Sequence, residues 1–256
     1  MQTVQARGLS SLRTVAYGAA PMSPTKLADL IARFGAIFMQ AYAATEAAMF
    51  VSVLDQADHL PGNEHATRRL SSAGRVTPGV EVYIVDDSGR PLPPGETGEI
   101  MIRCRATIQG YYRNPEATAA EFSDGTWRSG DLGYIDDAGY LFIVDRKKDM
   151  IISGGFNVYA VEVEAALASH PAVLMSAVVG VPHPEWGEAV HAEVALRTGA
   201  VATGAELIAH VKSQIGGYKA PKALTFVESL PLTAVGKVLR RVVKEKYWKD
   251  QTRKVG

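Results

Sequence analysis

The sequence predicts a fold of the α/β and α+β classes: the end of a large α/β layer, then a small β-barrel-like subdomain, then a small α+β domain. Three observations lead to this prediction. A strand–helix–strand pattern opens the chain, short strands separated by turn residues follow, and helices alternate with strands after a charged run at 145–149. We expect domains at 1–147 and 148–256, the first divided into an α/β end at 1–55 and a β-rich subdomain at 70–147.

The α/β pattern begins near the start of the chain. Residues 13–17 are typical of a strand that ends at Gly18, and Ser23 followed by Pro24 predicts a helix N-terminus. Apolar residues at spacings of three and four then predict one buried helix face: Leu27, Leu30, Ile31 and Phe34.

The next segments predict a change from α/β to β-rich structure. A second strand is expected at 36–39, followed by a loop at 40–50 and by irregular surface structure at 55–78. Short strands are expected at 80–85 and 99–103, with turn residues between them. This spacing of short strands is typical of a small barrel or sandwich.

The last part of the chain mixes the two element types. Residues 134–144 predict a hairpin, and the charged run at 145–149 cannot be core, so it marks a surface crossing between domains. Thr203 and Glu206 match a capping box at the start of a helix. The other expected elements are helices at 160–169 and 238–248 and strands at 176–181, 192–196 and 224–227.

Composition excludes several classes of protein. Hydrophobic residues make up 47% of the 256 residues and charged residues 21%, so the chain has the means to bury a core. Lys plus Arg and Asp plus Glu both number 27, which leaves no basic field for nucleic acid. The single cysteine, Cys104, excludes an internal disulfide framework. With no apolar run as long as a membrane span, we expect a cytoplasmic protein without a transmembrane segment.

The stretch at 40–46 carries the first candidate chemistry. The ring of Tyr42 can stack on a flat base, and small neighbouring residues allow a ligand to approach the backbone. Thr45 offers a hydroxyl to phosphate, and Glu46 offers a hard carboxylate oxygen to Mg²⁺. The alternative is a loop in which Glu46 is only solvated.

Two further stretches have the chemistry of a nucleotide or ligand site. Asp131, next to a glycine, can accept two hydrogen bonds from a vicinal diol such as ribose, or it can form an Asx turn. Gly154 and Gly155 permit close approach of a ligand chain, or they form an ordinary turn. Lys237, at the start of the last helix, can reach a phosphate or carboxylate, although most such lysines are solvated.

These motifs follow one another in a fixed order along the chain. In the order of its motifs the chain resembles the C-terminal part of the AMP-forming acyl-CoA synthetases, which belong to the adenylate-forming enzymes. The resemblance covers nearly the whole chain, from about residue 12 to about residue 244. The matching motifs lie at 17–22, 40–46, 127–131, 139–157 and 231–237.

The resemblance implies a two-step ligase. A carboxylic acid attacks the α-phosphate of ATP and gives acyl-adenylate and pyrophosphate. The resemblance implies that this acid is a fatty acid. Coenzyme A then attacks the adenylate and gives a thioester and AMP. The implied partners are therefore the acid, ATP with Mg²⁺ and coenzyme A, in lipid metabolism, and the small C-terminal domain is expected to be mobile between the two half-reactions.

The resemblance also implies a role for each matching residue. Tyr42 stacks on adenine, Thr45 binds phosphate and Glu46 holds the metal. The segment Gly18, Ala19 and Ala20 borders the adenine and acyl pocket, Asp131 holds the ribose, and Arg146 contacts the nucleotide. Lys148 is the hinge, Gly154 and Gly155 line the coenzyme A channel, and Lys237 neutralises charge between carboxylate and α-phosphate.

The chain departs from the family pattern at several places. Ala41 and Ala43 stand where the family usually has glycine, and Ala160 stands where proline is frequent. The family's Ser/Thr/Gly-rich phosphate loop does not occur in this sequence, so we expect a piece of a longer protein whose N-terminal portion supplies it. Alone, the chain is expected to be inactive and to self-associate through residues near 27–39. The alternatives are an adenylation domain of an assembly-line synthetase, and a non-catalytic remnant or regulatory module.

Overall fold

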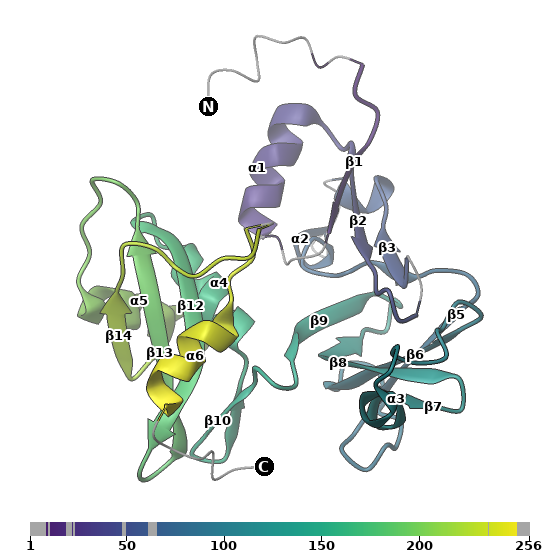
Figure 1. The fold of residues 1–256 in the computed structure, drawn as a ribbon. Coiled ribbons are helices and arrows are strands. Elements are labelled where there is room, and N and C mark those ends of the chain that lie inside the picture. The colour runs from purple at the N-terminus through teal and green to yellow at the C-terminus, as the bar shows by residue number, and fades with distance from the viewer. Residues whose placement is uncertain are drawn as a thin grey trace. The chain divides into compact units, whose positions relative to one another are not determined.

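The computed structural model of the chain describes residues 9, 11–18, 22, 24–47, 50–60, 66–234 and 236–249. The chain separates into two compact units, Met1–Ile143 and Val144–Gly256. Figure 1 shows the helices and strands of each unit, which combine the α/β, barrel-like and α+β parts that the sequence predicts. Within the described ranges, no helix has both the length and the apolar character needed to cross a membrane.

The first unit opens with a β–α–β element. Strands β1 (Val15–Gly18) and β2 (Phe38–Tyr42) pair in parallel and are joined by α1 (Pro24–Phe34). Strands β3 (Ser52–Leu54) and β4 (Arg75–Val76) extend the sheet in antiparallel order, giving β1-β2-β3-β4. The predicted strand–helix–strand pattern is therefore confirmed, and β1 lies at the edge of its sheet.

Two details of this region differ from the prediction. Strand β2 continues through Gln40 to Tyr42, where we expected a loop, because Gln40 and Ala41 pair with both β1 and β3 and Tyr42 pairs with β3. The irregular segment contains a 3₁₀ helix (Ala57–His59), α2 (Ala66–Arg69) and a buried His59. Leu27 of α1 is fully buried, as the predicted apolar stripe of this helix requires.

The rest of the first unit is a curled antiparallel sheet with the order β5-β6-β8-β7, in which β9 also pairs with β8. Its core contains Ile100, Ile102, Trp127 and Leu141. Helix α3 (Pro115–Glu121) follows Asn114, whose side chain caps it by accepting from the amide of Ala117. The strands are β5 (Val80–Val85), β6 (Gly98–Cys104), β7 (Phe122–Ser123), β8 (Thr126–Ile135) and β9 (Leu141–Arg146). Strand β9 continues past Ile143 into the second unit, which begins at Val144.

The second unit is a mixed sheet with helices on both faces. Because side chains alternate along a strand, Val178 of β12 faces the cluster of α4 and α5, whereas Ala177 and Val179 face Val243 of α6. The strands run in the order β11-β10-β13-β12, with β14 also on β13. The elements are β10 (Ile151–Ser153), β11 (Phe156–Val158), α4 (Ala160–Ala168), β12 (Val173–His183), β13 (Gly187–Leu196), α5 (Gly204–Ile215), β14 (Ala223–Phe226) and α6 (Arg240–Trp248).

The charged run at 145–149 contains a buried residue, which corrects the prediction that none of it is core. Asp145 is 3% exposed, whereas Arg146, Lys147 and Lys148 are exposed. The carboxylate of Asp145 accepts from two backbone amides and lies near the guanidinium of Arg240. A buried carboxylate is tolerated here because hydrogen bonds and a cation replace its hydration.

Candidate active site

Two of the predicted site residues meet in the first unit. The hydroxyl of Tyr42, at the end of β2, donates a hydrogen bond to Oδ2 of Asp131 over 2.7 Å. Asp131 is 8% exposed, so this residue is largely shielded from solvent. The arrangement places an aromatic ring next to a carboxylate, and carboxylate oxygens accept hydrogen bonds of the kind that a diol donates.

A bulge in β8 orients Asp131. Strand β6 pairs Glu99 with Leu132 and Met101 with Arg128, which leaves three residues of β8 opposite one residue of β6. Gly130 has a φ of 67°, in the left-handed region that favours glycine. The Oγ of Ser129 accepts from the amide of Asp131 over 3.0 Å, which closes the bulge. Bulges of this kind re-aim side chains and are frequent beside active sites.

Thr45 and Glu46 occupy a turn three residues after β2. The Tyr111 hydroxyl lies 3.2 Å from Oε1 of Glu46 and 2.5 Å from Oε2 of Glu121. The single phenolic proton is therefore shared between two carboxylates. Burial, and then the hydrogen bond to Glu121, raise the pKa of Tyr111, so the group stays a donor at neutral pH.

Glu46 fits a magnesium ion that is held chiefly by a nucleotide. Among the residues that the structure describes, no group of three or more His, Cys, Asp or Glu side chains is placed to bind a metal. A protein cage for a metal is thus not formed by this part of the chain. Mg²⁺ is commonly bound by one or two carboxylates together with substrate phosphates, and Glu46 next to Thr45 supplies one such carboxylate.

Gly18 has a structural reason to be glycine. A Cβ atom at this position would lie 2.5 Å from the carbonyl oxygen of Ala41 on the neighbouring parallel strand. Gly18 therefore lets β1 and β2 approach at the end of the sheet where Tyr42 lies. Ala19 and Ala20, which the resemblance places with Gly18 at the adenine and acyl pocket, lie outside the described residues.

In the second unit, Arg146 and Lys148 share one turn. The turn follows β9 and is closed by the amides of Asp149 and Met150, which donate to the carbonyl of Arg146 over 2.9 and 3.0 Å. The side chains of Arg146 and Lys148 are both exposed. They are therefore accessible to a ligand in solution.

Gly154 and Gly155 form the turn of the β10–β11 hairpin, in which Ser153 pairs with Phe156. Their φ values of 58° and 83° are both left-handed, as a two-residue hairpin turn of type I′ requires. The amide of Gly154 donates to the carbonyl of Trp186 over 3.2 Å. The turn alternative considered from the sequence is thus realised, and it leaves both glycines exposed to a ligand.

Lys237 lies in a loop before α6, not in the helix itself. The Lys237 amide donates to Oγ1 of Thr233 over 3.0 Å, and the Thr233 amide donates to the Lys237 carbonyl over 2.8 Å. The chain then continues to Arg240, the first residue of α6. The backbone at Lys237 is thereby held while its side chain is exposed.

Sequence reasoning did not identify Tyr111 or the partners of Arg240. Tyr111 reaches Glu46 across 65 residues, and Arg240 reaches Asp145 across 95 residues. No local pattern signals such contacts, because both depend on how distant elements pack.

Two family models match the chain in succession. Residues 1–112 match AMP-binding enzyme, and residues 162–237 match AMP-binding enzyme C-terminal domain. A medium/long-chain-fatty-acid–CoA ligase of Mycobacterium tuberculosis is 44% identical over 98% of this chain and 44% of its own length.

Solved structures agree with these matches. The amide bond synthetase McbA from Marinactinospora thermotolerans superposes with a TM-score of 0.85 at 42% identity, over 93% of this chain and 48% of its own. The o-succinylbenzoate CoA synthetase of Bacillus subtilis, in complex with its acyl-adenylate intermediate, gives 0.80 at 33% identity, over 91% and 46%. The chain spans about half the length of the relatives it matches. Both family models match in order, and the fold agrees with them. The chain therefore belongs to the AMP-binding enzymes, as the C-terminal part of an adenylate-forming enzyme.

Proposed function

We propose that the chain is part of an acid–CoA ligase that activates a carboxylic acid, of the fatty-acid class, with ATP and then transfers the acyl group to coenzyme A. The observation that carries the proposal is the hydrogen bond between Tyr42 and Asp131. It joins an aromatic ring and a carboxylate, the two groups suited to a base and to a ribose diol. The relatives that share this part of the chain include acid–CoA ligases.

In the first half-reaction the chain's residues bind the nucleotide and balance its charge. Asp131 accepts from the ribose hydroxyls, Thr45 donates to a phosphate oxygen, and Arg146 contacts the nucleotide. Lys237 places its ammonium between the acid's carboxylate and the α-phosphate, where it reduces their mutual repulsion. When bound, Mg²⁺ at Glu46 stabilises the negative charge that develops on the phosphate oxygens.

The second half-reaction needs a different nucleophile in the same cleft. We assign the functional domains to 1–147 and 148–256, with Lys148 as the pivot between them. Rotation removes Lys237 and brings the hairpin turn of Gly154 and Gly155 to the path of the pantetheine chain. The phosphate loop comes from the N-terminal portion of the same protein. We place the complete protein in the cytoplasm. The 256-residue chain alone is expected to self-associate.

An amine is a second candidate for the acceptor of the acyl group. The similarity to an amide bond synthetase at 42% identity is the observation that favours it. An amine and a thiol both attack the same acyl-adenylate, so the residues proposed for the first half-reaction are unchanged. The choice affects only the acyl-transfer step after adenylate formation.

The proposal is tested with the complete protein, defined as this chain joined to its N-terminal portion. The protein is given ATP, Mg²⁺ and a panel of fatty, aromatic and dicarboxylic acids, with coenzyme A or with simple amines, and AMP release is measured. We expect AMP release that requires an acid and yields a thioester with coenzyme A. An amide as the major product would show that the acyl group is transferred to an amine and not to the thiol of coenzyme A. AMP release that ignores the acid would refute the activation step itself.

A further inference from the structure

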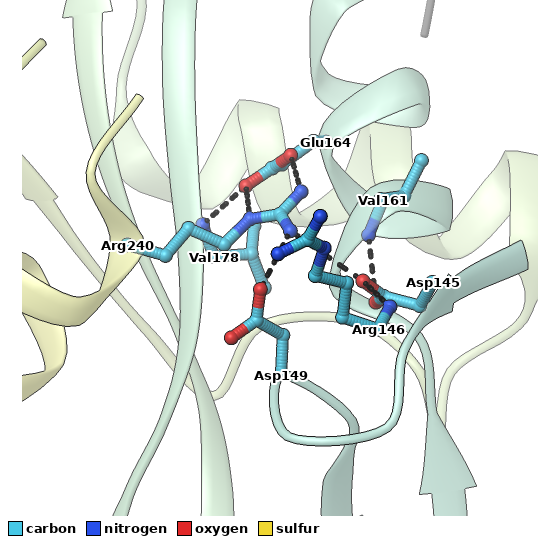
Figure 2. A network of polar contacts seen from close by, with 7 residues as sticks. All are labelled: Asp145, Arg146, Asp149, Val161, Glu164, Val178 and Arg240. Atoms are coloured by element: carbon cyan, nitrogen blue, oxygen red, sulfur yellow. Dashed lines mark hydrogen bonds and ion pairs between the residues drawn. The ribbon is translucent and has the colours of Figure 1, made fainter. Parts of the chain in front are cut away.

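Arg240, the first residue of α6, forms a bidentate ion pair with the carboxylate of Glu164. Its Nε donates to Oε1 of Glu164 over 2.8 Å, and its Nη2 donates to Oε2 of the same residue over 2.5 Å. Figure 2 shows this pair at the centre of a polar network between α4 and α6. A bidentate pair fixes both the distance and the orientation of a guanidinium.

The remaining terminal nitrogen of Arg240 lies near carboxylates on both sides of Lys148. Nη1 is 3.4 Å from Oδ1 of Asp145 and 3.3 Å from Oδ2 of Asp149 (Figure 2). One guanidinium therefore contacts the chain before and after the proposed pivot. These contacts cross the residue about which the chain would have to turn.

Asp145 is the most buried member of this network. Its side chain has no exposed surface, and its two oxygens accept from the amides of Arg146 and Val161 over 2.8 and 3.2 Å. Burial raises the pKa of Asp145 above its ordinary value, while the charge of Arg240 acts in the opposite direction. Losing the guanidinium would leave a buried carboxylate without its cation, which is strongly unfavourable.

Arg240 also lies at the end of the segment that carries Lys237. The Leu239 amide donates to the carbonyl of Pro231 over 2.8 Å, and the backbones of Thr233 and Lys237 are bonded to one another. The segment is thus closed on itself and is followed at once by the residue that Glu164 holds.

We propose that Arg240 is a positioning residue that ties the Lys237 segment to the turn at 146–149 and, through Asp145, restrains rotation of the chain at Lys148. The inference rests on the proposed function, which assigns the pivot and the lysine. Rotation at Lys148 moves Asp145 away from both Arg240 and Val161, so these bonds break in one of the two half-reactions. Weakening them changes the ratio of the two half-reaction rates instead of lowering both equally.

The first test uses Asp145→Asn and Arg240→Lys in the complete protein. Asparagine keeps the size of the side chain but removes its charge. Lysine keeps the positive charge but cannot form the bidentate hydrogen bonds of the guanidinium. The matched control is Arg241→Ala, since Arg241 is 79% exposed at its side chain and pairs along the helix surface with Glu245. Adenylate formation, thioester formation from supplied acyl-adenylate, and unfolding by denaturant are measured for each.

Both test variants are expected to change the ratio of the half-reaction rates by about fivefold or more, and the control is expected to leave it unchanged. Asp145→Asn is expected to have no further effect on the ratio in a Lys148→Pro background, where rotation is already blocked. An unchanged ratio, with both rates falling in step with stability, would reduce Arg240 to a structural residue and overturn the inference.

The second test uses the 256-residue chain itself. Hydrogen exchange is compared at residues 146–150 and 231–239, and both segments are expected to exchange faster in Arg240→Lys than in Arg241→Ala. Exchange that is unchanged in either segment overturns the inference, whatever the activity. A complete protein that makes no adenylate from any acid overturns the proposed function instead, and the exchange result tells the two failures apart.

Discussion

The hydroxyl of Tyr42 donates to Oδ2 of Asp131 across 89 residues of sequence. Asp131→Asn removes the charge that the proposed ribose contact uses, and we expect the KM for ATP to rise about tenfold or more. Tyr42→Phe keeps the ring and loses only this bond, so we expect a smaller rise. Steady-state kinetics on the complete protein measure both.

Tyr83 provides the matched control for this pair. It also donates to a carboxylate, that of Glu81, but on the exposed surface of β5. Tyr83→Phe is expected to leave the KM for ATP unchanged. Equal rises in Tyr83→Phe and Tyr42→Phe would remove the pair of Tyr42 and Asp131 from the nucleotide site.

Lys237→Ala is expected to affect the two half-reactions differently. Adenylate formation should fall by about 10²–10³-fold, because the ammonium stabilises charge that develops only in that step. Thioester formation from supplied acyl-adenylate should remain close to that of the unsubstituted protein. Lys212→Ala, an exposed lysine on α5, is the control. Equal losses in both half-reactions would contradict the assigned role.

Lys148→Pro tests the pivot. Proline fixes φ at the position proposed to rotate, so one half-reaction should become slow while the other is nearly intact. Lys148→Ala removes the same side chain but leaves the backbone free, and it should have little effect. If proline leaves the overall rate unchanged, the pivot lies elsewhere in the chain.

Stability is expected to fall in mild acid. His191 on β13 is 6% exposed, with its Nε2 2.9 Å from the Tyr247 hydroxyl, and burial lowers its pKa despite the nearby charge of Glu193. The unfolded chain, in which His191 has its ordinary pKa, then takes up protons that the folded chain does not. The unfolding free energy should therefore decrease from about pH 7 to about pH 5.

Denaturant unfolding across this pH range checks the expectation. His191→Gln should make the pH dependence shallower, and part of it should remain because burial also lowers the pKa of His59. Equal pH dependence in the two proteins would show that His191 is not a source of the effect.

Local patterns predicted the periodic elements well. Thr203 and Glu206 form the expected capping box, with both bonds present, and the apolar stripe of α1 is buried at Leu27. These features depend on residues three or four apart, which interact whatever the rest of the chain does. The sequence therefore indicated the start of α5 and the buried face of α1 correctly, whereas α6 begins at Arg240 and not at the predicted residue 238.

Features that depend on distant partners could not be predicted in the same way. Gln40 is a strand residue because it pairs with Tyr17 and Leu54 on either side, although its own pattern favoured a loop. Asp145 is buried because Val161 and Arg240 satisfy it from far along the chain. The bond of Tyr111 to Glu46 is a third case. In the candidate site, residue types were visible from the sequence, but their hydrogen-bonded partners were not.

The most direct test of the central claim is the mass-spectrometric detection of acyl-adenylate in a reaction without coenzyme A. The complete protein with ATP, Mg²⁺ and an accepted acid should accumulate acyl-adenylate, and adding coenzyme A should convert it to thioester and AMP. The 256-residue chain alone, which has no Ser/Thr/Gly-rich phosphate loop in its sequence, should form none. Thioester formation by the complete protein with ADP and phosphate as products, and without any acyl-adenylate, would contradict the proposed two-step activation.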